Sequence, residues 1–157
     1  MDAQGQYYVA DTGTGRVAIL SPDGAIVKEL KNQQDAKQPL KQPVGVGVAS
    51  NGSLIVTDAE TARVNWYDAS QQLIKSTPVA AFDSVHCAQI LVLSDNTWYQ
   101  SDPNGHRLVH FDATGTPIEQ IGSAADLGGP MAMALDPAGR IYVADPANRQ
   151  VAVFAPT

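Results

Sequence analysis

The side chains best suited to chemistry lie close together near the middle of this 157-residue chain. His86 and Cys87 are adjacent, and Gln89 follows two residues later. A histidine beside a thiol is the pairing that nucleophilic catalysis uses, but the pair also needs a third group to orient the base. The sequence identifies no such group, so we assign no catalytic residue. Two interpretations stay open: the three side chains form a small polar binding site, or Cys87 packs as a small buried hydrophobe and His86 lies in a loop.

The length of the chain predicts a single domain, whose elements must position these residues. Sixteen acidic and ten basic side chains give a net charge of −6, which disfavours nucleic-acid binding. We expect no membrane-spanning segment, since no run of 18 apolar residues occurs, and a single cysteine excludes an internal disulfide. The polar start MDAQGQ indicates no signal peptide. Few lysines and many Asn, Gln, Ser and Thr residues nevertheless point towards an exported or cell-surface bacterial protein, so the localisation stays open.

A fourfold repeat organises the chain. In each repeat an aspartate closes a β-rich run, and the next repeat aspartate follows 43 to 47 residues later. An arginine stands five residues after the aspartate in three repeats, and Gln150 takes that place in the fourth. The repeat aspartates are Asp11, Asp58, Asp102 and Asp145, and the arginines are Arg16, Arg63 and Arg107. The repeats cover approximately residues 1–30, 43–75, 87–122 and 130–157, with a polar loop at 31–42.

Each repeat is predicted to form four short strands. Runs of about four Val, Ile, Tyr, Trp and Phe residues, bounded by Gly, Pro, Asn and Asp, are too short for helices and typical of strands with turns. The second strand of a repeat ends at the aspartate, and the arginine opens the third. Because the two residues flank a hairpin loop, we expect the carboxylate to accept backbone N–H bonds and to pair with the arginine. This role is structural, in preference to metal binding.

The first strand of a repeat is expected at 44–49, 88–93 and 131–135, and in the second and fourth repeats it alternates large and small side chains. Gly45, Gly47, Ala132 and Ala134 are the small ones. Small residues at every second position indicate that one face of the strand is crowded. An innermost strand in a radial array of sheets has such a face. The sequence therefore predicts an all-β fold of four-stranded antiparallel β-propeller blades.

The repeats resemble the NHL repeat, a family of six-bladed propellers. The resemblance lies in a P-x-G-x-x-V segment followed by G-x-[IL]-x-V-x-D-x4-R-V. The segments PMAMALDPAGRIYVADPANRQVAVF and DAQGQYYVADTGTGRVAIL match it most closely. The third repeat departs from it, since Cys87 replaces the proline and Gln89 and Leu91 replace small residues. The resemblance implies a propeller that serves as a binding platform, and it does not identify the partner.

The strand count gives about three and a half blades, because the first repeat lacks its first strand and the last repeat lacks its fourth. Closed propellers typically have four to eight blades. Three interpretations stay open: a fragment of a longer propeller, half of a ring completed by a second copy of the chain, or a four-bladed closure with two trimmed blades.

Enzymes of the propeller lactonase or lyase type hold a metal with several histidines or carboxylates that converge from inner strands. Here the inner strands offer Asp136 at most, and all three histidines, including His106 and His110, belong to one repeat. We therefore expect no metal and no cofactor. The predicted function is a non-catalytic binding or scaffold module that presents a propeller face to a protein or glycan partner. A metal-dependent lactonase or lyase and a self-assembling structural segment are the alternatives.

Two other groups of residues have both a structural and a functional interpretation. The lysines around the polar loop either face solvent or contact an acidic partner. The large aromatic residues on the second and third strands are expected to fill the core in preference to forming a carbohydrate platform. The lysines are Lys28, Lys31, Lys37 and Lys41, and the aromatic residues are Trp66, Tyr67, Trp98, Tyr99 and Phe111.

Overall fold

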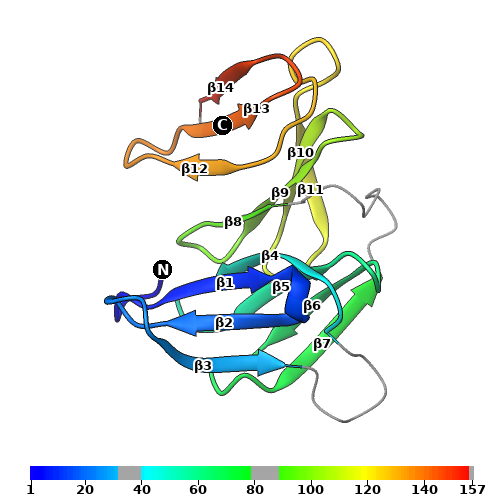
Figure 1. The fold of residues 1–157 in the computed structure, drawn as a ribbon. Helices are drawn as coiled ribbons and strands as arrows, with labels where there is room; N and C mark the ends of the chain where they lie inside the picture. The colour runs from blue at the N-terminus through cyan, green and yellow to red at the C-terminus, as the bar shows by residue number, and fades with distance from the viewer. Residues whose placement is uncertain (32–39, 79–88, 156–157) are drawn as a thin grey trace. The chain divides into compact units, whose positions relative to one another are not determined.

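The computed structural model confirms an all-β chain built from antiparallel sheets (Figure 1). It describes residues 1–31, 40–78 and 89–155. Among these residues there is no helix with the length and apolar character needed to cross a membrane.

Four sheets follow one another along the chain, one for each repeat, and in each the strands lie in sequence order. The first sheet holds β1 (Tyr7–Asp11), β2 (Arg16–Leu20) and β3 (Ile26–Lys31), and the second holds β4 (Pro43–Val48), β5 (Leu54–Asp58), β6 (Arg63–Tyr67) and β7 (Leu73–Pro78). The third holds β8 (Ile90–Val92), β9 (Trp98–Asp102), β10 (Arg107–Phe111) and β11 (Pro117–Ile121), and the fourth holds β12 (Met133–Leu135), β13 (Ile141–Asp145) and β14 (Gln150–Phe154). The middle sheets are four-stranded blades, and within the described residues the outer two have three strands each.

The hairpin after each repeat aspartate has the predicted register. The aspartate lies opposite the residue five positions later in all four sheets, as in the pairs Asp11–Arg16 and Asp145–Gln150. The residue four positions after the aspartate has a positive φ in every repeat: Gly15 at 65°, Ala62 at 50°, His106 at 55° and Arg149 at 54°. Only glycine adopts this conformation without steric cost, so three of the four hairpins hold a side-chain-bearing residue in the left-handed region.

Each sheet has two faces, which we define from positions relative to the repeat aspartate. Face A carries the residues one and three positions before the aspartate and six and eight positions after it. Face B carries those two and four positions before it and seven and nine positions after it. Side chains alternate between the faces along a strand, and residues paired across the hairpin share a face. Face A of the first sheet carries Tyr8, Ala10, Val17 and Ile19, and face B carries Tyr7, Val9, Ala18 and Leu20. In the fourth sheet the same positions place Tyr142, Ala144, Val151 and Val153 on face A and Ile141, Val143, Ala152 and Phe154 on face B.

The chain divides into two compact units, Met1–Val85 and His86–Thr157. In the first unit, face A of the first sheet packs on face B of the second. Buried Val17 and Leu30 meet Leu54, Val56 and Tyr67 there, and Leu40 completes the cluster. The core of this unit therefore lies between two sheets.

The second unit repeats this arrangement. Tyr99 and Leu108, from face A of the third sheet, form a buried cluster with Ile141 and Val143 from face B of the fourth. Leu127, in the segment that connects the two sheets, is fully buried in the same cluster. Each unit is thus a pair of sheets joined face A to face B, with a leucine from the connecting segment in the core.

The small residues of the first strands differ in environment. Gly45 and Gly47 on β4 are buried, as expected for a crowded strand. Ala132, just before β12, and Ala134, on β12, are exposed. The difference has a physical cause, because these alanines lie on the open face A of the fourth sheet and no further sheet covers them within the described residues.

Candidate functional site

Of the three predicted site residues, only Gln89 lies among the described residues; His86 and Cys87 lie outside them. Gln89 is exposed and immediately precedes β8. Its backbone N donates to Oγ of Ser101 at 2.9 Å, and its carbonyl accepts from the backbone N of Ser101 at 3.1 Å. The backbone of Gln89 thus fixes the start of the first strand, while its side chain stays accessible. The binding site predicted around these residues remains a prediction.

The repeat aspartates have the structural role that the sequence predicted. Asp145 is fully buried, and its carboxylate accepts hydrogen bonds from the backbone N of Gly128 at 2.9 Å, the backbone N of Gly129 at 2.8 Å and Nε2 of Gln150 at 3.0 Å. Burial opposes ionisation, but these donors favour the charged form and leave the pKa of Asp145 below its usual range. The carboxylate thereby joins the connecting segment to the hairpin.

Asp58 makes the same connection in the second sheet. Its Oδ2 accepts from the backbone N of Lys41 at 2.6 Å and of Gln42 at 2.8 Å, and its Oδ1 accepts from the backbone N of Thr61 at 2.9 Å. These carboxylates have their hydrogen-bonding capacity filled by the protein, so they are not free to hold a ligand.

The predicted aspartate–arginine pairs form in two of three repeats. Nε of Arg16 lies 2.8 Å from Asp11, and Nε of Arg107 lies 2.9 Å from Asp102. The prediction was wrong for Arg63, which instead donates from Nε to Oγ of Ser76 at 2.6 Å and from Nη2 to the Ser76 carbonyl at 2.9 Å. The cause lies in Asp58, whose two oxygens are already occupied by backbone donors.

A polar network surrounds His110 on β10. Its Nε2 lies 2.9 Å from Oγ1 of Thr97, its Nδ1 lies 3.5 Å from Oε2 of Glu119, and its ring stacks on Tyr99 with centroids 4.1 Å apart. Thr97 in turn donates its hydroxyl proton to Oδ1 of Asp95 at 2.8 Å. Burial and the neighbouring Glu119 carboxylate raise the pKa of Tyr99.

This network contains the hydroxyl, imidazole and carboxylate groups of a catalytic relay. The direction of its hydrogen bonds, however, is that of a structural network. The Thr97 hydroxyl has one proton, and Asp95 accepts it. The Thr97 oxygen is then left to accept a hydrogen bond from His110 and cannot pass a proton to it. A nucleophile activated by a base needs the opposite polarity.

Of the other groups considered as metal ligands, Asp136 is engaged in structural bonds and Nδ1 of His106 is buried. Asp136 accepts from the backbone N of Ala138 and of Arg140, both at 2.9 Å, and pairs with Nε of Arg140 at 2.7 Å. Burial limits access to Nδ1 of His106, which lies in the hairpin after Asp102 and has no hydrogen-bond partner among the described residues. Within residues 1–31, 40–78 and 89–155, no three His, Cys, Asp or Glu side chains are placed to hold a metal ion.

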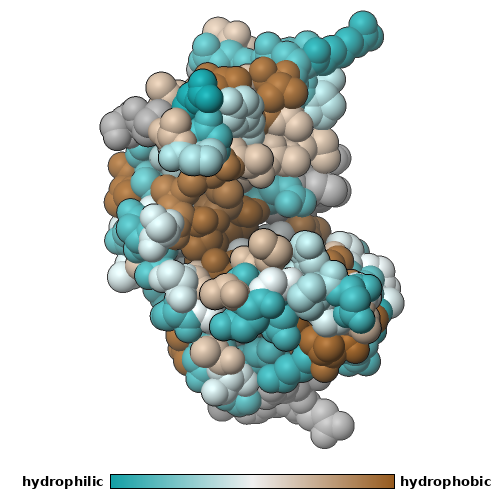
Figure 2. Space-filling view, turned by 90° about the vertical axis from the view of Figure 1, so that its left-hand side faces the viewer, coloured by the Kyte–Doolittle hydropathy of each residue, from teal (hydrophilic) through white to brown (hydrophobic). Residues whose placement is uncertain are grey.

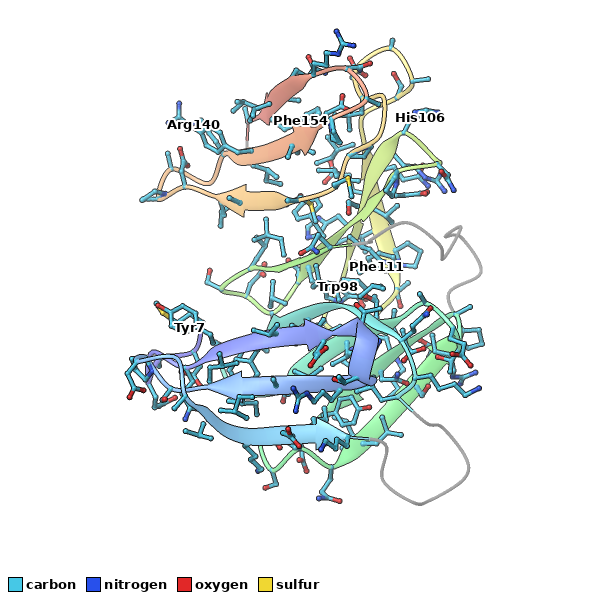
Figure 3. The ribbon with its side chains drawn as sticks, in the orientation of Figure 1. Tyr7, Trp98, His106, Phe111, Arg140 and Phe154 are labelled. Atoms are coloured by element: carbon cyan, nitrogen blue, oxygen red, sulfur yellow. The ribbon has the colours of Figure 1, made fainter. Side chains whose placement is uncertain are left out.

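The aromatic residues pack in the core, which confirms that prediction. Trp98 is fully buried and stacks on Phe111, with 4.1 Å between ring centroids and 9° between planes. Figure 3 labels the two side chains, which lie close together. Trp66, Tyr67 and Tyr99 are buried as well. Two of the lysines around the polar loop form ion pairs: Lys41 pairs with Glu60 at 2.8 Å, and Lys31 pairs with Glu29. Lys37 lies outside the described residues.

The accessible feature that the sequence did not predict is the open face A of the fourth sheet. A hollow of about 610 Å³ lies on it, lined by residues 131–132, 144–146 and 149–151. The surface is recessed at Ala132 and Ala144 because their side chains are small. Val151 also lines the hollow and is 64% exposed. Figure 2 shows apolar surface at the top of the view, at the level of β12–β14. The arrangement suits a bulky apolar group entering from outside.

Comparisons with known proteins agree with this architecture. No protein-family model matches the sequence, and no curated protein does either. Among solved structures, a streptogramin B lyase matches 99% of this chain and 53% of its own, with a TM-score of 0.71 and 16% identity. Virginiamycin B lyase from Staphylococcus aureus matches 100% of this chain and 54% of its own, with a TM-score of 0.72 and 14% identity.

The WD40 β-propeller domain of Doa1 also matches, with a TM-score of 0.68 and 10% identity over 99% of this chain and 48% of its own. The chain thus spans about half the length of each of these structures. At such low identity the likeness shows the fold alone. The chain is built from β-propeller blades.

Proposed function

We propose that this chain is a non-catalytic binding module and that face A of the fourth sheet is the surface that contacts its partner. The exposure of Val151 and Val153, at 64% and 51%, is the observation that carries the proposal. Removing the surface of such aliphatic side chains from water is favourable by roughly 25 cal/mol for each Å². Contiguous apolar surface beside a hollow is typical of sites that bind another molecule.

The chemistry of the hollow favours a protein partner over a glycan. The residues that line it include no aromatic ring on which a sugar could stack. Most of their side chains are apolar; the charged ones are Arg149 and Asp145, and the Asp145 carboxylate is satisfied by its own hairpin and connecting segment. Protein interfaces have this composition at their centre, with few charged residues and a polar rim.

The blades are of the NHL type in this proposal. Support comes from the segment PMAMALDPAGRIYVADPANRQVAVF and its three relatives in the chain, which resemble that repeat. NHL-like propellers serve as binding platforms, which agrees with an accessible sheet face and with polar groups that are occupied by structural hydrogen bonds.

A photo-cross-linking experiment tests the proposal. A benzophenone amino acid is placed at Val151 or, as a matched control, at Ile118, which is 55% exposed on β11. The purified chain and the chain in an extract of the cells that express it are then irradiated. We expect protein adducts at Val151 to exceed those at Ile118 several-fold. Equal yields at the two positions, or none at either, would contradict a protein-binding role for this face.

An enzymatic function is the second candidate, because two of the structures that share this fold are streptogramin-type lyases. A virginiamycin B lyase of known structure was solved with quinupristin. The chain incubated with quinupristin and divalent cations should leave the compound intact, as in buffer alone, because the carboxylates of Asp58, Asp136 and Asp145 are engaged in structural bonds. Saturable loss of quinupristin would establish the enzymatic alternative.

A further inference from the structure

We infer that face A of the fourth sheet docks on face B of the first sheet of a second copy of this chain. The inference rests on the proposed function and identifies the protein partner. It follows from a packing rule that the chain displays twice. In both units, face A of one sheet packs on face B of the next sheet along the chain.

The residues of the two internal contacts occupy equivalent repeat positions. On face A, Val17 and Leu108 stand six residues after their repeat aspartates, and both are fully buried. On face B, the residues two positions before the aspartate are Val56 and Val143, and both are fully buried too. The contact is therefore a property of the repeat, with aliphatic side chains at fixed positions on both sides.

Face A of the fourth sheet has the same residue types and no cover. Val151 is equivalent to Val17 and Leu108, yet it is 64% exposed. Val153 is equivalent to Ile19, which is 2% exposed, and yet is 51% exposed itself. The side chains that the repeat buries elsewhere thus face solvent here.

Face B of the first sheet is the matching open half. Tyr7 is 48% exposed, whereas the equivalent Leu54 and Ile141 are 1% and 4% exposed. Val9 is 44% exposed, whereas the equivalent Val56 and Val143 are fully buried. Tyr7 projects from the start of β1 in Figure 3. A large ring next to a valine suits the hollow above Ala132 and Ala144.

A second copy of the chain supplies the required surface. In the described residues of each copy, face A of the fourth sheet and face B of the first sheet are open, so a contact between them is head-to-tail between different surfaces. The chain spans 53% of the length of a structurally similar lyase. The contact buries four side chains that the repeat otherwise keeps from water.

The molar mass in solution tests the inference. Light scattering on the purified chain should give twice, or a higher multiple of, the 16.6 kDa of one chain. The double variant Val151→Glu, Val153→Glu and the double variant Tyr7→Glu, Val9→Glu should each return the mass of a single chain. The control variant Ile74→Glu, Ile118→Glu should keep the mass of the wild type, since these residues are 63% and 55% exposed on β7 and β11, away from both faces.

Mixing separates a specific contact from general stickiness. The face A variant keeps an intact face B, and the face B variant keeps an intact face A, so the mixture can form one contact that neither variant forms alone. A mass of two chains in the mixture supports the inference. A wild-type chain that stays single at all concentrations overturns it, as does a control variant that dissociates like the others. If the wild type is single but Val151 still cross-links to another protein, the inference fails and the proposed function stands; if neither occurs, both fail.

Discussion

Gln150 donates from Nε2 to Oδ2 of Asp145 over 3.0 Å, in the place where Arg16 and Arg107 donate from Nε to Asp11 and Asp102. A neutral amide thus replaces a guanidinium without loss of the hairpin register. The replacement is tolerated because the backbone N–H groups of Gly128 and Gly129 supply the remaining donors to the carboxylate. The aspartate, and not the residue opposite it, is the centre of each hairpin.

Replacing Asp145 with alanine should therefore lower the free energy of unfolding by about 2–4 kcal/mol, because it leaves two half-buried backbone donors without their acceptor. Asp11→Ala is the matched control. Its carboxylate binds Arg16 and no segment preceding the sheet within the described residues, so its loss should have a smaller effect. Urea unfolding of the two variants measures the difference. Equal losses would show that the bonds from Gly128 and Gly129 contribute little.

Acid should destabilise the fold through the same kind of group. Despite the opposing effect of burial, hydrogen bonds hold the pKa of Asp145 below its ordinary 3.8, and the Thr114 hydroxyl and backbone donors hold that of Asp112 below the same value. A carboxyl with a depressed folded-state pKa stabilises the fold above its unfolded pKa, and that stabilisation is lost as the pH falls through the folded value. The free energy of unfolding should stay level from about pH 7 to about pH 5 with respect to these groups and fall below about pH 4. A gain in stability on acidification below that point would contradict the assignment.

Two neighbouring glycines should respond differently to alanine. Gly15 has a φ of +65°, and a Cβ there would lie 2.9 Å from the Lys41 carbonyl oxygen. Gly15→Ala should cost about 1–3 kcal/mol from the left-handed backbone and the contact together. Gly13 has nothing within 4 Å of the added Cβ, so Gly13→Ala should change the stability by less than about 0.5 kcal/mol. Thermal unfolding of the pair checks the prediction, and similar shifts in melting temperature would refute it.

Leu127 should contribute far more to stability than its place outside the strands suggests. It is fully buried among Tyr99, Leu108, Ile141 and Val143. Leu127→Ala should cost about 2–5 kcal/mol, as in other large-to-small substitutions in a core. Leu73→Ala, at a position that is 40% exposed, serves as the control and should cost much less. A mild effect at Leu127 would mean that the connecting segment does not complete the core of its unit.

The strands could be predicted because the same pattern occurs four times. Short apolar runs between turn residues predicted the strands β5, β10 and β13, and the aspartate with its partner five residues later predicted the hairpins. Leu40 and Leu127 carried a signal that was not used, since each stands 18 residues before its repeat aspartate and both are buried. The left-handed residue in each hairpin gave no compositional signal, because Ala62, His106 and Arg149 occupy positions that normally favour glycine.

The candidate surface could not be predicted from residue types. Val151 and Val17 occupy the same repeat position and are both valine, yet one is exposed and the other is buried. The difference depends on whether another sheet lies above the residue, which local pattern does not encode. The partner of Arg63 was missed for a related reason: the donors that occupy Asp58 come from Lys41 and Gln42, which lie far from it in the sequence.

Hydroxyl-radical footprinting at increasing protein concentration tests most directly whether the two open faces meet. The oxidation rates of Tyr7 on face B and of Val151 on face A report the accessibility of each side chain, and Ile118 on β11 reports a surface outside both faces. The account predicts that protection of Tyr7 and Val151 rises together with concentration while Ile118 stays unchanged. Oxidation of Tyr7 and Val151 that is independent of concentration, at a rate typical of free side chains, would contradict it.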